Sequence, residues 1–295
     1  MALHASNMDE TAERLVRSAE LMSFDVDRDI DWSSGFVPDL AYFPEHRCSL
    51  FGTAMWDRLS RDQKVEFSKH QLASTHAIEA WVETLLMQML IRQVYNADSA
   101  TSYAWHLYTE IADECRHSTM FGRMVAATEM PTYGAPRWAR QAAKILGATS
   151  PPVVAMALAM FFEEYGDALQ RETAADESVQ PLVRRISHIH VIEESRHLKF
   201  ARAELAERLP NSAVEKALIS ALYGPIALLV TRYMVSPKMY ENCGLDKRAA
   251  TRAARKNKHW RQTQKWASEH AMRTFAEFGI RNRFGDALCR VAGVL

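Results

Sequence analysis

One short motif occurs twice in this sequence, eighty residues apart, inside segments that contain few helix breakers. The stretches ECRH (residues 114–117) and ESRH (residues 194–197) both read Glu-x-Arg-His. The chain has 295 residues but only 11 glycines and 10 prolines, so the segments between breakers are long. No segment alternates apolar and polar residues with the period of two that marks a half-buried strand. These observations predict an all-α fold built from long helices.

Capping signals and breakers set the predicted helix boundaries. Ser60 and Gln63 have the spacing of a capping box. The helix that carries the first motif should end before Pro131, because the residue before a proline disfavours the helical region. TSPP, residues 149–152, is typical of a helix that starts with proline in its first turn. The predicted helices span about residues 8–23, 60–94, 99–129, 137–146, 152–173, 176–208, 211–235 and 246–278.

We expect a single domain over residues 1–295 with three parts. A four-helix core occupies about residues 60–208, an N-terminal arm residues 1–59, and additional helices residues 211–295. Beyond one short helix the arm is irregular, but it is rich in aromatic residues, which disordered segments lack. The arm is therefore predicted to pack against the bundle.

The other two long helices supply the glutamates that a dimetal site requires. Glu79, in THAIEAWVE, precedes Glu114 by 35 residues, and Glu163, in AMFFEEYGD, precedes Glu194 by 31 residues. Dimetal carboxylate bundles use one glutamate from each of two helices and a Glu-x-x-His from each of the other two. Carboxylates and imidazoles suit iron or manganese, whereas thiolates favour zinc or iron–sulfur clusters. The order of these residues gives each helical hairpin one complete half-site.

Further ionisable side chains lie on the same helix faces as the proposed ligands. His190 lies one turn before Glu194 and can be a seventh ligand. The equivalent residue in the first half is Glu110, which can be an eighth ligand but is better interpreted as a supporting acid. Asp113 and Glu193 are placed to fix the tautomer of a histidine on the facing helix. The candidates for supporting roles are Glu83, Glu110, Asp113, Asp167, Glu193, Arg116 and Arg196.

Structural interpretations compete with each functional one. A single histidine on an apolar helix face is more often a core residue, and only the combined pattern favours a metal site. The stretch 247–266 carries eight basic residues and no acid. It can bind nucleic acid or an acidic electron-transfer partner, but the formal net charge of zero favours a solvated helix face. We expect no nucleic-acid partner.

The pattern resembles the AurF family of ferritin-like di-iron N-oxygenases, relatives of p-aminobenzoate N-oxygenase, over roughly residues 40–275. The resemblance is carried by HAIEAWVE, DECRH, FFEEYGD and HVIEESRH, including the extra histidine at position 190. It implies a ferritin-like four-helix core and a homodimer. It also implies two iron ions, with manganese or a mixed pair as alternatives, and O₂ as co-substrate. The implied ligands are Glu79, Glu114, His117, Glu163, His190, Glu194 and His197, with no catalytic side chain beyond them.

The resemblance implies a monooxygenase that converts an aryl amine to hydroxylamine or nitro products. A di-iron C–H hydroxylase or desaturase is the alternative on the same scaffold, since a fold and a metal site do not fix the substrate. Less favoured are a ferritin-like iron storage protein and a metal-free helical interaction module. No nucleotide fingerprint is present, so an external reductase, ferredoxin or reduced nicotinamide is expected to supply electrons.

Three features of the sequence bear on the cellular compartment of the protein. The start MALHASNMDETAERL is unlike a secretory signal. The longest apolar stretches, VVAMALAMFF and ALISALYGPIALLV, are short for a bilayer span. Four cysteines without a CxxC pair are typical of a reducing compartment. We therefore expect a cytoplasmic protein without a membrane partner.

Overall fold

The computed structural model describes residues 7–209 and 212–295, and within these ranges every named element is helical. In chain order the elements are α1 (Asn7–Leu21), the 3-10 helix η1 (Glu45–Arg47), α2 (Ala54–Asp57), α3 (Arg61–Tyr95), α4 (Ser102–Ala127), α5 (Arg137–Thr149), α6 (Pro152–Ala175), α7 (Pro181–Arg208), α8 (Ala213–Tyr233), α9 (Pro237–Asn242), α10 (Lys247–Lys256), α11 (Lys258–Ala267), α12 (Glu269–Glu277) and α13 (Arg283–Ala292). The all-α prediction is confirmed. The first six residues of the arm and the helix start predicted at residue 211 lie outside the described residues.

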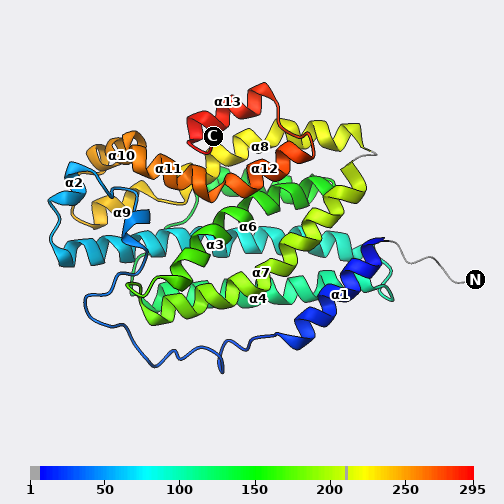
Figure 1. Ribbon diagram of the computed structural model, residues 1–295, viewed down its shortest axis with the longest axis horizontal. Coiled ribbons are helices and arrows are strands. Elements are labelled where there is room, and N and C mark those ends of the chain that lie inside the picture. Colours follow the sequence, from blue (N-terminus) through cyan, green and yellow to red (C-terminus); the bar gives the residue numbers. More distant parts are fainter. Residues whose placement is uncertain (1–6, 210–211) are drawn as a thin grey trace, which may run out of the picture.

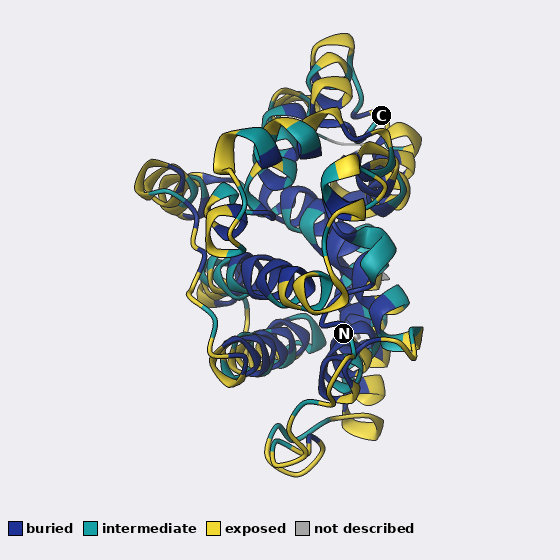
Figure 2. Ribbon diagram, turned by 90° about the vertical axis from the view of Figure 1, so that its left-hand side faces the viewer, coloured by how far each residue is buried: buried dark blue, intermediate teal, exposed yellow. Residues whose placement is uncertain are grey.

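Helices α3, α4, α6 and α7 form the central bundle (Figure 1). α3 packs along α4, and α6 packs along α7, as two hairpins closed by short loops. The hairpins meet through α3 against α6 and through α4 against α7, and α1 covers α4 and α7. Buried residues concentrate on the inner faces of these helices, while the outer turns are exposed (Figure 2).

Local signals in the sequence fix where the bundle helices begin. The predicted capping box is present: Ser60 Oγ accepts from Gln63 N–H at 3.2 Å, and Gln63 Oε1 accepts from Ser60 N–H at 2.9 Å. Two backbone N–H donors at the start of α3 are thereby satisfied. α6 begins at Pro152, whose fixed φ suits the first turn of a helix. These starting points set the depth at which each helix presents its glutamates.

The arm packs against the bundle, as predicted. Ala41 forms an isolated bridge with Val179 in the loop between α6 and α7. The side-chain amide of Gln180 accepts from Val37 N–H at 2.8 Å and donates to Val37 O at 2.9 Å. Residues 177–178 form a turn, and Val179 and Gln180 contact the arm, so α7 begins at Pro181 rather than at the predicted residue 176.

The segment predicted as one helix over residues 246–278 is interrupted. α10 ends and α11 begins at Asn257, whose backbone is extended, with φ −67° and ψ 112°. Its side chain accepts from His259 N–H at 3.0 Å and donates to the carbonyl oxygens of Ser49 and Phe51 at 3.0 and 2.9 Å. A second break at Ser268 separates α11 from α12. The prediction of a continuous helix was wrong, because these tertiary hydrogen bonds outweigh the local helical pattern.

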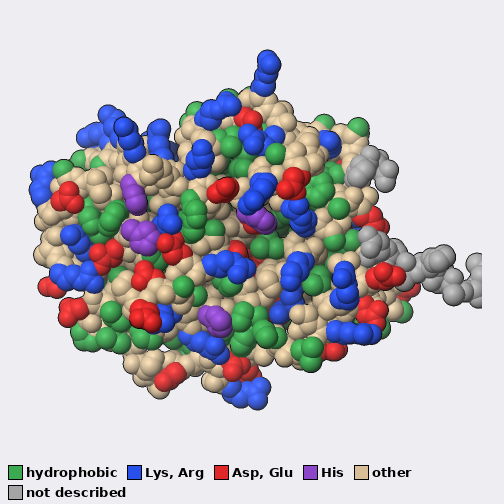
Figure 3. Space-filling model, in the orientation of Figure 1, with side chains coloured by type: hydrophobic (Ala, Val, Ile, Leu, Met, Phe, Trp, Pro, Cys, Tyr) green, Lys and Arg blue, Asp and Glu red, His purple; other side chains and the backbone are tan. Residues whose placement is uncertain are grey.

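The basic side chains of residues 247–266 lie mainly over α10 and α11, and Figure 3 shows Lys and Arg gathered over α10 at the upper left. Trp260 is buried. Trp266 is half-buried, with the Arg47 guanidinium carbon 3.8 Å from its ring centroid. Neither ring is presented for stacking on a base, which favours the interpretation of this stretch as a solvated helix face.

Helix α8 lies outside the bundle and packs against α6 and α13. Gly224 and Gly285 permit close contact with α13, since a Cβ at Gly224 would lie 2.7 Å from Gly285 Cα. The segment Ala213–Asn242 is long and apolar enough to cross a membrane by length and composition, a test that core helices also pass. The other side of α8 faces α3 and α5 across an apolar cavity.

Candidate metal centre

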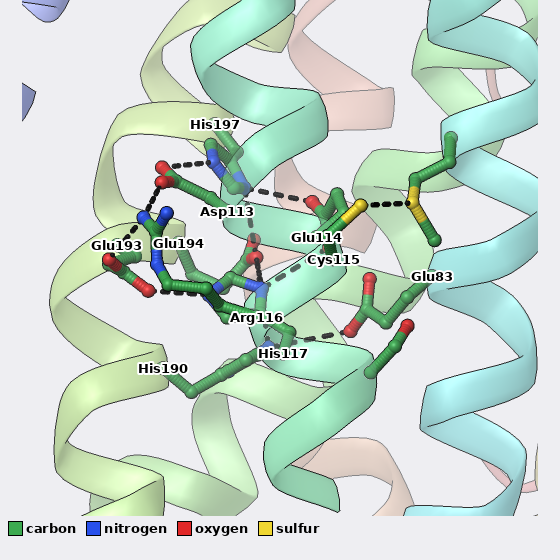
Figure 4. Close-up of polar contacts among 12 residues, drawn as sticks. Glu83, Asp113, Glu114, Cys115, Arg116, His117, His190, Glu193, Glu194 and His197 are labelled. Carbon is green, nitrogen blue, oxygen red and sulfur yellow. Dashed lines mark hydrogen bonds and ion pairs between the residues drawn. The ribbon is translucent and has the colours of Figure 1, made fainter. Parts of the chain in front are cut away.

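The two Glu-x-Arg-His motifs face each other in the middle of the bundle. Glu114 and His117 on α4, and Glu194 and His197 on α7, are buried. His197 Nδ1 lies 3.0 Å from Glu114 Oε1 and 2.9 Å from Glu194 Oε1. His117 Nδ1 lies 3.2 Å from Glu114 Oε2 and 3.5 Å from Glu194 Oε1. Each Nδ1 atom therefore points at carboxylates from both helices, as Figure 4 shows.

Two further groups of potential ligands adjoin these four residues. Glu83, His117 and His190 form one group, and Glu163, His190 and Glu194 form the other. In each group the ligand atoms lie within 4.8 Å of one another. His117, His190 and Glu194 each belong to two groups, so the groups merge into one cluster that is able to bind a dimetal centre. We call it the ligand cluster; it comprises Glu83, Glu114, His117, Glu163, His190, Glu194 and His197.

Each motif histidine contacts the acid that precedes the opposite motif. His117 Nε2 lies 2.9 Å from Glu193 Oε2, and His197 Nε2 lies 3.1 Å from Asp113 Oδ2. A carboxylate at Nε2 favours the tautomer that carries its proton there and leaves the Nδ1 lone pair available to a metal. The crossed arrangement thus aims both Nδ1 atoms into the cluster.

Two arginines hold the same acids from the outer side. Arg116 donates to Glu193 Oε1 at 2.8 Å and also pairs with Asp113. Arg196 donates to Asp113 Oδ2 at 2.9 Å. Burial alone raises the pKa of Asp113, but its hydrogen bond with His197 and the two guanidinium groups hold that pKa well below its usual range. Asp113 is therefore ionised and acts as a hydrogen-bond acceptor at neutral pH.

Helix α3 directs two carboxylates towards the centre, one turn apart. Glu83 Oε1 lies 3.5 Å from His190 Nε2 and belongs to a ligand group. Glu79 is in none of the groups found among the described residues, but it lines a small cavity together with Glu83, Glu163 and His190. Burial raises the pKa of Glu79 to about 7. Glu83, which the sequence predicted in a supporting role, thus lies at ligand distance, and Glu79 lies beside it.

Glu110 and Asp167 lie outside the ligand cluster. Glu110 is buried, and its Oε2 lies 3.2 Å from Nε2 of His106, one turn earlier. Asp167 pairs with Arg171 at 2.6 Å and lines an outer cleft with His270. Asp167 is buried but belongs to none of the ligand groups, so its supporting role at the centre stays a prediction.

The ionisable groups of the cluster perturb one another strongly. Burial and neighbouring carboxylates raise the pKa of Glu83 and that of Glu163 well above the usual range. Burial disfavours protonation of His117, yet hydrogen bonds with Glu114 and Glu193 raise its pKa to about 9. So many acids in one buried space cannot all be ionised at neutral pH without cations among them.

Several buried atoms at the centre have no hydrogen-bond partner among the described residues. They include both carboxylate oxygens of Glu79, Glu83 Oε2, Glu114 Oε1, Glu194 Oε2 and both ring nitrogens of His190. An unsatisfied buried polar atom costs about 1–3 kcal/mol, and more when it is charged. Two divalent cations would satisfy these atoms and balance the carboxylates, and this set of oxygen and nitrogen donors suits iron or manganese. The residues present therefore fit a dimetal centre.

Comparison with known families identifies relatives of this arrangement. A model of the family described as P-aminobenzoate N-oxygenase AurF matches residues 5–279. The chain belongs to the AurF family. The resemblance inferred from the motifs is thereby confirmed.

Curated relatives cover part of the chain. The uncharacterized proteins MT0908 and Rv0885 of Mycobacterium tuberculosis and Mb0909 of Mycobacterium bovis are each 28% identical over 189 residues, or 61% of this chain. The matched stretch is 55% of their length, so the chain spans about half the length of the curated relatives it matches.

Solved structures share the fold at low sequence identity. A variant of an R2-like ligand-binding oxidase with an aerobically reconstituted Mn/Fe cofactor has a TM-score of 0.53 and 14% identity, with 94% of both chains covered. Another variant, with an Fe/Fe cofactor, has a TM-score of 0.50 and 16% identity, covering 88% of this chain and 93% of the other. These similarities confirm the predicted ferritin-like bundle with additional helices.

Six of the seven ligands that the resemblance to the AurF family implied lie in the ligand groups, and Glu79 lies a turn away from Glu83. One signal for Glu83 was present in the sequence: it precedes Glu114 by 31 residues, the same separation as between Glu163 and Glu194. Tyr165 had no such signal. Its hydroxyl is buried without a hydrogen-bond partner among the described residues and lines the small cavity beside Glu79. Family membership and the ligand cluster together point to the middle of the bundle as the site of a dimetal centre.

Proposed function

We propose that this protein is an O₂-activating non-haem di-iron monooxygenase that adds oxygen to the nitrogen of an aryl amine. The observation that carries this proposal is the buried ligand cluster, whose unpartnered atoms fit two divalent cations. Membership of the AurF family supports an amine as the substrate. Iron is the proposed metal, with manganese or a mixed pair as the alternative, because the R2-like neighbours carry Fe/Fe and Mn/Fe cofactors.

The residues of this chain would hold the ions and shield them from water. Carboxylates from α3, α4, α6 and α7 and the Nδ1 atoms of His117 and His197 converge on one buried space. Asp113 and Glu193 would keep the opposite nitrogens of these histidines protonated. Redox chemistry with O₂ is what a bound dimetal centre supplies.

The proposed reaction uses one amine and one O₂ per cycle. One oxygen atom is inserted into an N–H bond to give a hydroxylamine, and the other leaves as water. Two electrons and two protons balance this step. The electrons would come from an external reductase, ferredoxin or reduced nicotinamide, and further cycles would carry the hydroxylamine towards the nitro product. We also propose that the enzyme is a cytoplasmic homodimer.

C–H hydroxylation or desaturation is the second candidate. The observation that favours it is an apolar cavity beside the cluster, lined by residues such as Leu85 and Ile226, which suits a hydrocarbon substrate as well as an amine. The two candidates share the metal centre and differ in the bond that is oxidised.

The test uses the full chain purified from iron-replete cells. Metal analysis should find two irons per chain. After anaerobic reduction and exposure to O₂ with 4-ethylaniline, mass spectrometry should detect the hydroxylamine or nitro product with one ¹⁸O label from ¹⁸O₂ per added oxygen. Two irons with a C-hydroxylated product would favour the second candidate. A folded protein that retains no stoichiometric metal would contradict both candidates.

A further inference from the structure

The cavity that touches the ligand cluster is too small for an organic substrate. It measures about 20 Å³ and is lined by Glu79, Glu83, Glu163 and His190 on its polar side. A space of this size holds about one water molecule. An aniline ring must therefore occupy additional space, which the structure has to provide close by.

A second cavity of about 280 Å³ lies directly beside the first. Val82 on α3 and Phe162 on α6 line both cavities and form the partition between them. The larger cavity lies between α3, α5, α6 and α8, with walls that include Trp81, Leu85, Leu158, Ile226 and Leu229. Its volume is near the lower end of small-molecule sites, which measure about 300–1,000 Å³.

The walls of the larger cavity are apolar. Its lining residues include no Asp, Glu, Lys, Arg or His, and Trp81 and Tyr233 supply the polar side-chain atoms. A carboxylate placed there would lose its hydration and find no cation, which is costly. By contrast, the small cavity presents polar groups, namely the Tyr165 hydroxyl, which has no hydrogen-bond partner among the described residues, and the side-chain amide of Gln170 beside Glu79. The two cavities together therefore have one polar end and one long apolar end.

We propose that the larger cavity binds the apolar body of the substrate and that the amine reaches the small cavity past Val82 and Phe162. The substrate is then an uncharged amine with a hydrocarbon tail or an extended ring system, and 4-aminobenzoate is a poor ligand. The chemistry at the amine rests on the proposed function, whereas binding of the apolar body does not. Val82 and Phe162 set how far a substrate reaches towards the metals.

Two other clefts do not suit this role. One, of about 340 Å³, is lined by Arg232, Arg255 and Arg261, and another, of about 690 Å³, by Glu164, Arg171 and further charged residues. Neither shares a lining residue with the small cavity. The apolar cavity borders solvent at α5, where Ala142 is an exposed lining residue. A substrate can enter there without opening the bundle.

Calorimetric titration of metal-free and metal-loaded full-length protein with 4-alkylanilines tests the proposal. Each added methylene from 4-methyl- to 4-butylaniline should lower the Kd about fourfold, the factor expected for burial of one methylene group. 4-Aminobenzoate should bind at least about a hundredfold more weakly than 4-butylaniline, because its carboxylate would be buried without a partner. A Kd that is independent of chain length, or equal binding of 4-aminobenzoate, overturns the proposal.

Adjacent leucines on α8 provide a matched pair of variants. Leu229 lines the apolar cavity, whereas Leu228 lines the arginine-rich cleft, and both are half-buried. Leu229→Trp should weaken 4-butylaniline binding at least tenfold, and Leu228→Trp should leave it unchanged. Ala142→Phe narrows the same cavity from α5 and should act like Leu229→Trp, so the test stands if one variant fails to fold.

The outcomes separate this proposal from the proposed function. Chain-length-dependent binding without N-oxygenated product supports the cavity and contradicts the proposed reaction. Product formation from 4-ethylaniline with unchanged binding in Leu229→Trp and Ala142→Phe contradicts the cavity alone. A second copy of the chain covering α5 and α8 would also overturn the proposal; it would appear in sedimentation as a dimer that Leu229→Trp dissociates, without any 4-butylaniline binding.

Discussion

The two hairpins of the bundle carry the same motif but differ one turn before it. In α7 that position is His190, whose ring centroid lies 4.4 Å from that of His117. In α4 the position is Glu110, which pairs with His106 outside the ligand cluster. The second hairpin therefore offers three imidazole and carboxylate side chains from α7, where the first offers two from α4.

The glutamate helices differ in the opposite direction. α3 directs both Glu79 and Glu83 towards the centre, whereas α6 contributes Glu163 there, while Asp167 pairs with Arg171 on the outer side. The first hairpin thus supplies an additional carboxylate, and the second supplies an additional histidine. The repeated motif therefore brings equivalent ligand side chains together from the two hairpins, while the neighbouring residues make the two halves of the ligand cluster chemically different.

The largest effect is expected from removing the motif glutamates. Glu194 belongs to two ligand groups and Glu114 to one. Glu194→Ala should therefore abolish binding of both ions, and Glu114→Ala should leave at most one, as measured by metal analysis of protein from iron-replete cells. The exposed Glu207 on α7 provides a control, because Glu207→Ala should retain both ions. Two ions in all three variants would refute the ligand assignment.

Asp113 and Glu193 should contribute equally to metal affinity if the two hairpins hold their motif histidines in the same way. Asp113→Asn and Glu193→Gln each remove the charge that faces a motif histidine. Loss of such a partner weakens metal binding about 10–100-fold. Competition with a chelator measures the affinity of each variant for Fe(II). A loss in one variant only would show that the hairpins hold their histidines by different means.

The difference one turn before the motifs can be tested directly. His190→Leu should weaken binding of one of the two ions by about tenfold or more and spare the other, because a neutral imidazole ligates a single ion, whereas the two oxygens of a carboxylate such as Glu194 can contact both. Glu110→Gln should leave both affinities within about threefold, because Glu110 lies outside the ligand groups. Stepwise Mn(II) titration followed by electron paramagnetic resonance separates the two ions. Equal losses in the two variants would mean that the halves are more alike than the structure indicates.

The smallest expected effect is on how the free energy of unfolding depends on pH. It arises at a second position where the two hairpins differ. Seven residues beyond the motif histidine, α4 has Met124 and α7 has Glu204, and both are buried. Tyr103 and Arg208 contact the Glu204 carboxylate, with Glu110 and Glu207 nearby. Burial raises the pKa of Glu204 above its ordinary value of 4.5.

The direction of this pH effect follows from the numbers of protons that the folded and unfolded chains bind. Between pH 4.5 and the raised pKa, the folded chain keeps a proton on Glu204 that the unfolded chain has lost. The free energy of unfolding therefore falls as pH rises through this interval. Glu204→Gln removes this contribution, so the variant should lose less stability than the natural chain between pH 4.5 and 7. Urea unfolding of both proteins across this range measures the difference, and parallel curves would exclude a titrating Glu204.

Much of the bundle and of the site could be predicted because it depends on local spacing. The capping box at Ser60 and the proline at the start of α6 depend on contacts within one turn. The Glu-x-Arg-His motifs fix ligand and supporting acid together, because Asp113 and Glu193 are adjacent in sequence to the motif glutamates. Such patterns can be recognised in the sequence without knowledge of the tertiary structure.

The remaining features depend on contacts between distant segments. A helix turn puts Glu79 and Glu83 on one face of α3, so the 31-residue separation was only a hint for Glu83, and the packing of α3 against the other helices decides which of the two lies at ligand distance. The break at Asn257 requires the carbonyl groups of Ser49 and Phe51 as partners. The apolar cavity needs α5 and α8 in position against the bundle, which no periodicity in the sequence specifies.

The bridge between the arm and the α6–α7 loop has a consequence for the order of assembly. Gln180 and Val37 are 143 residues apart, whereas the helices of each hairpin are neighbours in sequence. Contacts between distant residues require closure of a long loop, which slows their formation relative to local pairing. The hairpins should consequently form first and the arm should attach last. In a nascent or partly denatured chain, the metal-binding helices are then together before the segment that ties their loop is in place.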